Sequence, residues 1–335
     1  MNYIFVAFEG LKAGLGTGHI VRIKKVIDAL RSSASSVESI IFISNISEQS
    51  SNYSLMRVHN LEDASDAILS CVRHKNIDLV VFDCLDYCED VYAECSNQSI
   101  ITVGIDTSSR QSVMLDILVN PVIENQLSHL RGPFYAIHQG GHYLQEQQIC
   151  IESKKSIFIC FGGIDYQNHF GGILPFISSL PGSYDINIVL ASEDDFELAP
   201  PLRDNVNFFF RPPNFYDLLE RASFAIISGG ILLQECMYMG IPAYVIPQYD
   251  HQFKIAKEKE VSGMLTGVGS LQPDYRDSIN FILSVIEDTS HLGHLALKSR
   301  SSDDGYGLSR VLSILKVLKY LSWDSVFFEQ EIYLL

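Results

Sequence analysis

Short apolar segments alternate along the chain with longer segments in which apolar residues recur at helical spacing. Most of the short segments are continuously apolar, a pattern typical of parallel strands that are covered on both faces. The pattern predicts strands in two series: 2–9, 39–46, 77–83, 99–106 and 116–121, then 155–163, 185–192, 205–210, 224–230 and 243–248.

The segments between these strands predict amphipathic helices, at 19–32, 61–74 and 274–289 among others. In the first of them, one helical face carries the apolar residues Ile20, Ile23, Val26, Ile27 and Leu30. Repeated strand–helix–strand units are typical of α/β proteins with doubly wound parallel sheets. We therefore expect two Rossmann-like domains that face a cleft.

The length of 335 residues exceeds the usual size of one domain, and a polar stretch at 140–155 separates the two series of strands. We expect an N-terminal domain over 1–145 and a C-terminal domain over 154–305. A helix over 306–322 should pack back towards the N-terminal domain. The aromatic and acidic tail, 323–335, packs either on the body of the same chain, which we expect, or on another subunit.

Composition excludes several classes of protein. With 47% hydrophobic and 19% charged residues the chain can bury large cores, which excludes a disordered protein. The net charge of −16 argues against a nucleic-acid partner or an anionic membrane surface. No apolar segment reaches the ~20 residues that span a bilayer, and Glu9 interrupts the first apolar run. We expect a cytoplasmic protein without a signal peptide or an integral membrane segment.

The seven cysteines lie mostly inside apolar segments, as reduced buried thiols do. Cys84, Cys88 and Cys95 form one cluster, but their spacing matches no familiar zinc pattern and no second pair completes four ligands. We therefore expect no metal site.

Three predicted strands end in glycine-rich turns that open a helix, namely GLGTGH (14–19), FGGID (161–165) and SGGILLQE (228–235). Such a turn presents unpaired N–H groups at the positive end of a helix dipole, where phosphate binds well. GLGTGH has neither the dinucleotide-binding spacing nor that of a phosphate-binding loop. Because open parallel sheets bind ligands at the carboxyl ends of their strands, we expect the site at these turns.

Two polar residues follow the first turn. His19 is either a structural histidine at the start of a helix or a neutral base facing the ligand. Arg22 lies on the same side of the helix, where it either meets an anion or is an ordinary surface arginine.

Several segments together carry a resemblance to a known family: GTGHIVR (16–22), VGIDTSSRQSVMLDILVNP (103–121), GPFYA (132–136), FICFGGID (158–165), ISGGILLQECMYMGIPAYVI (227–246) and DDGYGLSR (303–310). In this order they resemble the hydrolases of pseudaminic acid biosynthesis that act on UDP-2,4-diacetamido-2,4,6-trideoxy-β-L-altropyranose. Those hydrolases are similar to MurG-type glycosyltransferases of the GT-B fold. The resemblance covers the chain up to about residue 320.

The resemblance implies a UDP-sugar substrate, no metal or cofactor, and specific roles. His19 would be the base for a water molecule that attacks the anomeric carbon, and Glu235 would bind the ribose hydroxyls. Backbone N–H groups around Gly229, Gly230 and Ile231 would hold the pyrophosphate, and the region of Phe210 would take the uracil. The turns and the adjoining helix add further candidate binding positions: Gly16, Gly18, Gly162, Gly163 and Leu232.

Two segments depart from the family pattern. The Asp-x-Tyr turn expected after the third strand is DCLDYCED here, so Asp83 is followed by a displaced Tyr87, which either replaces the missing tyrosine or is a surface aromatic. The segment PQYDHQFKIAKE (247–258) is more similar to sugar-nucleotide transferases. It places Gln248, Asp250, His251 and Gln252 near the donor sugar, with helix capping as the alternative role for Asp250.

The mixture of features allows three functions. A hydrolase would release UDP and a free sugar, within surface-glycan or nonulosonic acid biosynthesis. A GT-B glycosyltransferase would transfer the sugar to an acceptor hydroxyl at the first domain. A sugar-nucleotide binding protein would do neither. We expect the hydrolase, while the oligomeric state stays open.

Overall fold

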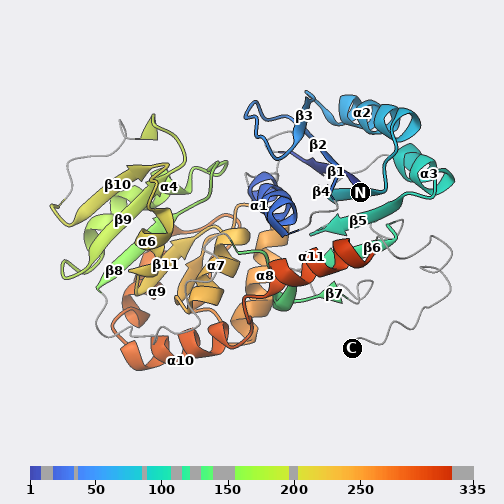
Figure 1. The fold of residues 1–335 in the computed structure, drawn as a ribbon. Coiled ribbons are helices and arrows are strands. Elements are labelled where there is room, and N and C mark those ends of the chain that lie inside the picture. Colours follow the sequence, from blue (N-terminus) through green and yellow to red (C-terminus); the bar gives the residue numbers. More distant parts are fainter. Residues whose placement is uncertain are drawn as a thin grey trace. The chain divides into compact units, whose positions relative to one another are not determined.

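The computed structural model describes residues 1–8, 18–33, 37–84, 89–106, 115–120, 130–138, 155–195 and 203–318. The chain divides into two compact units: Met1–Gln139 together with Tyr306–Leu335, and Gly140–Gly305. Each unit contains one sheet in which every paired strand is parallel to its neighbour (Figure 1). The predicted α/β class with two Rossmann-like units is confirmed.

The sheet of the first unit has the order β3-β2-β1-β4-β5-β6-β7. Its strands are β1 (Asn2–Ala7), β2 (Ser39–Ser44), β3 (Ser54–Arg57), β4 (Leu79–Asp83), β5 (Ile101–Ile105), β6 (Ile117–Asn120) and β7 (Leu130–Arg131). The chain winds outward from β1 to β3 and then returns to place β4 on the other side of β1. The strand order therefore reverses between β1 and β4, which is where ligands bind in open α/β sheets.

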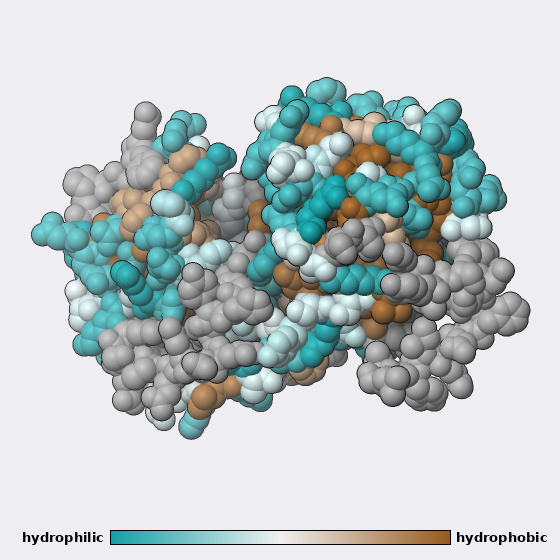
Figure 2. Space-filling view, viewed as in Figure 1, coloured by the Kyte–Doolittle hydropathy of each residue, from teal (hydrophilic) through white to brown (hydrophobic). Residues whose placement is uncertain are grey.

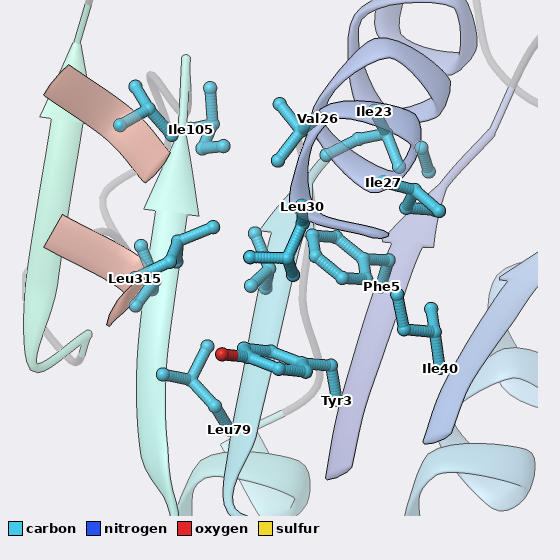
Figure 3. Close-up of a cluster of buried hydrophobic side chains, with 14 of the residues drawn as sticks. Tyr3, Phe5, Ile23, Val26, Ile27, Leu30, Ile40, Leu79, Ile105 and Leu315 are labelled. Carbon is cyan, nitrogen blue, oxygen red and sulfur yellow. The ribbon is translucent and has the colours of Figure 1, made fainter. Parts of the chain in front are cut away.

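The helices of the first unit are α1 (Gly18–Ser33), α2 (Leu61–His74), α3 (Glu89–Asn97), the 3-10 turn η2 (Pro133–Tyr135) and α11 (Gly307–Val317). The predicted apolar face of α1 is buried, as expected. It packs with Leu315 of α11 over Tyr3 and Phe5 of β1 in one hydrophobic cluster (Figure 3). A side chain at Gly307 would overlap the carbonyl oxygen of Ala136, so glycine permits the close approach of α11 to this unit.

The sheet of the second unit has the order β10-β9-β8-β11-β12-β13, and its order reverses between β8 and β11. Its strands are β8 (Ser156–Cys160), β9 (Asp185–Leu190), β10 (Val206–Phe210), β11 (Phe224–Ile227), β12 (Ala243–Val245) and β13 (Gly267–Val268). Its helices are α4 (His169–Ile173), the 3-10 turn η3 (Leu174–Ser179), α6 (Phe215–Glu220), α7 (Ile231–Met239), α8 (Asp250–Val261), α9 (Tyr275–Val285) and α10 (Thr289–Arg300). Separate apolar clusters cover the two faces of the sheet.

Every strand predicted from the apolar pattern is present, and the short strands β3, β7 and β13 are additional. On the face drawn in Figure 2, hydrophilic residues make up most of the described surface and apolar residues show mainly between them. Within the described residues, no helix has the length and apolar character needed to cross a membrane.

Candidate functional site

The carboxyl ends of β1 and β4 bring together the polar residues of the first unit. Ala7 at the end of β1 pairs in register with Asp83 at the end of β4. Helix α1 follows β1 in the chain and begins at Gly18, so His19 and Arg22 lie in its first turns. The topology thus places two residues of one helix, His19 and Arg22, beside a carboxylate that is 64 and 61 positions further along the chain.

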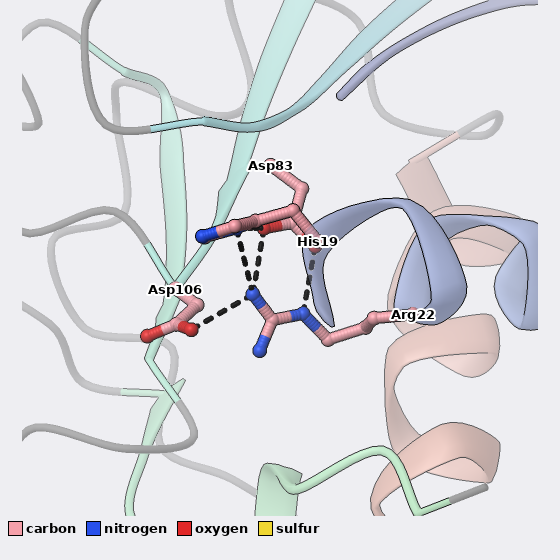
Figure 4. A network of polar contacts seen from close by, with 4 residues as sticks. All are labelled: His19, Arg22, Asp83 and Asp106. Atoms are coloured by element: carbon pink, nitrogen blue, oxygen red, sulfur yellow. Dashed lines mark hydrogen bonds and ion pairs between the residues drawn. The ribbon is translucent and has the colours of Figure 1, made fainter. Parts of the chain in front are cut away.

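Asp83 is the centre of a compact network of charged side chains (Figure 4). Its Oδ1 lies 2.6 Å from Nδ1 of His19. Arg22 binds the same carboxylate with two nitrogens, Nε to Oδ2 at 2.7 Å and Nη2 to Oδ1 at 2.6 Å. Nη2 of Arg22 also lies 2.8 Å from Oδ2 of Asp106, the residue that follows β5. One guanidinium therefore holds two carboxylates.

Burial makes this network electrostatically strong. The side chains of Asp83 and Arg22 are 0% and 1% exposed, whereas those of His19 and Asp106 are 13% and 18% exposed. Burial alone would raise the pKa of Asp83, but Arg22 and His19 outweigh it and hold that pKa below its usual range. Burial opposes the charge of Arg22, but Asp83 and Asp106 raise its pKa above its ordinary value. Asp83, Arg22 and Asp106 together carry one formal negative charge beside His19.

The contact with Asp83 fixes the chemistry that His19 can perform. A carboxylate accepts hydrogen bonds, so in the neutral imidazole Nδ1 of His19 carries the proton and donates a hydrogen bond to Asp83. The lone pair is then on Nε2, where the imidazole can accept a proton from a nucleophile. Asp83 would stabilise the imidazolium that forms, as the aspartate does in a catalytic triad.

Arg22 is not the ordinary surface arginine that its sequence position allowed, because its guanidinium is buried and binds Asp83 and Asp106. A contact of Arg22 with a bound anion stays a prediction. Asp106 was not among the site residues predicted from the sequence. Its position in the sequence could have identified it, because Asp106 ends a predicted strand and a polar run follows. Site residues of a parallel sheet lie at that edge.

In the second unit, glycines line the carboxyl ends of β8 and β11. Gly162, Gly229 and Gly230 have φ values of +92°, +105° and +67°, a region that side chains rarely adopt. Gly230 is the N-cap of α7 and no side chain caps this helix start. The first N–H groups of α7, at Ile231 and Leu232, have no partner within a helix by geometry. This helix start is therefore suited to an anion.

Gln248 and Gln252 follow β12 and join the glycine turns. Side-chain atoms of Gln252 lie within 4 Å of the positions that a Cβ would take at Gly229 and Gly230. The side chain of Gln252 also accepts a hydrogen bond from the backbone N–H of Gln248, at 2.9 Å.

The side-chain amide of Gln248 ties this segment to the loop that contains Gly162 and Gly163. It donates to the carbonyls of Phe161 and Ile164, at 2.6 and 3.1 Å, and it accepts from the backbone N–H of Tyr166 at 2.7 Å. These contacts use the amide internally, so Gln248 braces the ends of β8 and β12.

Glu235 and Phe210 lie in the part of the second unit that contains β10 and α6. Glu235 is buried on α7, and its charge adds to the effect of burial in raising the pKa of Tyr216 on α6. Phe210 ends β10, the edge strand that precedes α6, and the guanidinium of Arg211 lies 5.0 Å from its ring centroid. The structure thus places Glu235 near the helix that follows Phe210.

Asp250 and His251 open helix α8. Tyr249 is the N-cap, so Asp250 is not the capping residue; it forms an exposed ion pair with Lys254 instead. The His251 ring stacks on Tyr249, with centroids 5.6 Å apart, and Tyr249 meets the exposed Tyr166 edge-on. These aromatic rings therefore lie beside the loops after β8 and β12 that Gln248 connects.

Two predicted site residues, Gly16 and Tyr87, lie outside the described residues. Of the predicted site residues that the structure describes, Gly18, His19, Arg22 and Asp83 belong to the first unit and the others to the second. Among the described parts of the chain, no group of three or more His, Cys, Asp or Glu side chains is arranged to hold a metal ion.

Comparison with known proteins gives relatives at low identity. No protein-family model matches the chain. It is 23% identical over 329 residues to the spore coat polysaccharide biosynthesis protein SpsG of Bacillus subtilis (strain 168), covering 90% of this chain and 95% of that protein.

Several solved structures share the fold of this chain. MurG of Acinetobacter baumannii has a TM-score of 0.68 at 9% identity, covering 95% of this chain and 100% of that chain. The UDP-GlcNAc 2-epimerase of Neisseria meningitidis, solved bound to UDP-GlcNAc, has a TM-score of 0.65 at 14% identity over 95% and 100% of the two chains. The predicted fold class, that of MurG-type proteins, is confirmed.

Proposed function

We propose that the protein is an enzyme of polysaccharide biosynthesis that hydrolyses a UDP-sugar to UDP and the free sugar. The similarity to SpsG and the fold shared with MurG and the 2-epimerase support action on a nucleotide sugar in glycan biosynthesis. The observation that carries the hydrolytic step is the pair of His19 and Asp83, because it leaves a basic nitrogen at the end of the parallel sheet.

The nucleotide belongs at the second unit in this proposal. The diphosphate would lie at the N-terminus of α7, where Gly229 and Gly230 admit it close to the backbone. Glu235 would bind the ribose after a local adjustment of its buried side chain, and the end of β10 would take the uracil. The sugar would lie on the side of β12, near His251 and Gln252.

The chemical step needs one base and one stabilised leaving group. Nε2 of His19 takes a proton from water while the water oxygen bonds to the anomeric carbon. The bond between that carbon and the phosphate oxygen breaks, and its electron pair leaves with UDP. The helix N-terminus stabilises the negative charge that develops on the diphosphate. The oxygen that the sugar gains comes from water, and the proton that the water loses goes to His19.

Sugar transfer to an acceptor hydroxyl is the second candidate function. Its support is the segment 247–258 and the fold shared with MurG, since the same donor site and base would serve an acceptor oxygen in place of water. A non-catalytic binding protein is disfavoured because binding alone does not need the hydrogen-bonded pair of His19 and Asp83.

The test is incubation with a panel of UDP-hexoses and UDP-N-acetylhexosamines without any acceptor, followed by mass analysis. We expect UDP and free sugar in equal amounts. An intact donor that is consumed only when an acceptor is added would instead support transfer. Tight UDP-sugar binding without turnover in either condition would support a binding protein.

A further inference from the structure

We propose that Asp106 contacts the substrate directly, by accepting a hydrogen bond from a hydroxyl or amide N–H on the sugar ring beside the anomeric carbon. This inference rests on the proposed function, because it assigns a further residue to the same site. It differs from a purely structural role in which Asp106 only balances the charge of Arg22.

The position of Asp106 is fixed by both its backbone and its side chain. Its N–H donates to the carbonyl of Val119 at 2.9 Å, and its Oδ2 binds Nη2 of Arg22 at 2.8 Å. Its φ of 55° lies in the left-handed region, which costs roughly 1 kcal/mol or more for a residue other than glycine. Two anchors thus hold a carboxylate in an uncommon conformation at the carboxyl edge.

Neutralising Arg22 does not require this second carboxylate. Asp83 already balances the guanidinium through a two-nitrogen contact in a buried setting. Asp106 attracts the same nitrogen of Arg22, but its negative charge also lies close to that of Asp83. A carboxylate held in an uncommon conformation beside a pair that is already balanced is explained by a ligand contact better than by charge balance alone.

One oxygen of Asp106 is available for that contact. Oδ2 faces Arg22, and Figure 4 shows the other oxygen turned away from the guanidinium. Among the described residues Oδ1 has no hydrogen-bond partner, and the side chain is 18% exposed while Asp83 is completely buried. Of the two carboxylates, Asp106 is therefore the one that a ligand can reach.

The place of Asp106 relative to the base decides which part of a ligand it meets. Nη2 of Arg22 lies 2.8 Å from Asp106 and 3.3 Å from Nδ1 of His19, so all three groups share one small volume. A carboxylate accepts only from O–H and N–H groups. In a UDP-sugar, the donors nearest the reacting carbon are the hydroxyl or acetamido N–H on the adjacent ring carbon.

The experiment compares wild type and Asp106→Asn on three UDP-sugars. Asparagine tolerates the left-handed backbone, and its carbonyl can still accept from Arg22, but it then presents N–H₂ to the ligand in place of an acceptor. The probes are UDP-glucose, UDP-N-acetylglucosamine and UDP-2-deoxyglucose, the last of which has no donor on the carbon next to the anomeric carbon.

We expect Asp106→Asn to lower kcat/KM roughly 10- to 100-fold for the sugars with that donor, the size of one hydrogen bond to a charged group. The 2-deoxy sugar should change less than about 3-fold, since it has no such bond to lose. Inhibition by UDP alone should be unchanged, because UDP lacks the sugar.

Asp116→Asn is the matched control. Asp116 flanks the other end of β5, where its Oδ2 accepts from the N–H and hydroxyl of Thr102. Its variant should lower stability without changing selectivity among the three sugars. Loss for all three sugars equally in Asp106→Asn, or no loss at all, would overturn the substrate contact. A wild type that releases no UDP from any probe or other UDP-sugar would instead contradict the proposed function.

Discussion

The carboxyl edges of the two sheets lie at the same topological position, but one presents mainly polar side chains and the other mainly backbone groups. In the first unit the edge is a network of ionisable side chains: His19, Arg22, Asp83 and Asp106. In the second unit it consists of glycine backbone and a helix start, braced by the amide of Gln248. Under the proposed function, side chains would carry out the chemistry at the first edge and backbone N–H groups would bind the nucleotide at the second.

We expect the two edges to control different properties, namely turnover and stability at the first edge and UDP affinity at the second. Charges in a buried network set protonation states and depend on every partner, so substitutions there should change turnover and stability. Backbone N–H groups cannot be removed by substitution, and they respond instead to changes in φ. Turnover and UDP affinity should therefore separate between the two units.

The largest expected effect is the loss of the base. His19→Ala should lower kcat roughly 10²- to 10⁴-fold while leaving the Kd for UDP unchanged, because general base catalysis supplies a factor of that size. Asp83→Asn should lose a similar factor, since an amide does not hold the productive tautomer. Stopped assays of UDP release and calorimetric titration with UDP measure the two quantities.

The matched control for that prediction is His59→Ala, which removes an exposed histidine of the same unit. It should behave as wild type. Full retention of kcat in His19→Ala would remove the base assignment, whatever the effect on binding.

Removal of the buried guanidinium should have the largest effect on stability. Arg22→Met leaves Asp83 as an uncompensated buried charge, and breaking such a pair costs about 3–5 kcal/mol. Arg73→Met is the comparison, because Arg73 forms an ion pair with Glu94 while 52% exposed, and exposed pairs contribute little. Urea denaturation followed by circular dichroism should rank the two; equal midpoints would show that burial does not strengthen the network.

The sequence predicted the strands, the main helices and some of the residues at each carboxyl edge. It did not predict which of these residues meet, because that depends on the order of the strands in the sheet. Apolar runs identify strands, and a glycine turn before His19 identifies a strand end. Local pattern does not reveal that β4 lies beside β1 while β5 lies next to β4, and that order brings Asp83 and Asp106 to Arg22. The internal use of Gln248 was likewise invisible, since its partners are backbone atoms about eighty positions away.

A change at the backbone edge should affect nucleotide binding. Gly230→Ala places a side chain on a φ of +67°, at a strain of roughly 1–3 kcal/mol, and should weaken UDP several-fold by distorting the start of α7. Gly240→Ala imposes the same strain at φ +65° at the other end of this helix. It should lower thermal stability equally but leave the Kd for UDP unchanged; equal effects on the Kd would contradict a phosphate site at α7.

The smallest expected effect is on the dependence of stability on pH. Arg22 and His19 outweigh burial and lower the pKa of Asp83 in the folded chain, so its stabilisation is present above its unfolded pKa and is lost as pH falls. Burial raises the pKa of Asp116, so its contribution has the opposite sign and favours folding as pH falls. Between about pH 6 and pH 3, Asp83→Asn should lose less stability than wild type and Asp116→Asn should lose more. Parallel curves in thermal melts would contradict this assignment.

The central claim is that His19 directs water to the anomeric carbon of a UDP-sugar, and isotope labelling tests it most directly. The reaction is run without an acceptor in water enriched in ¹⁸O, and the released UDP is analysed by mass. Attack at carbon predicts UDP with no ¹⁸O, together with free sugar, and neither product from His19→Ala. Labelled UDP would show attack at phosphorus instead, and an intact donor would contradict hydrolysis.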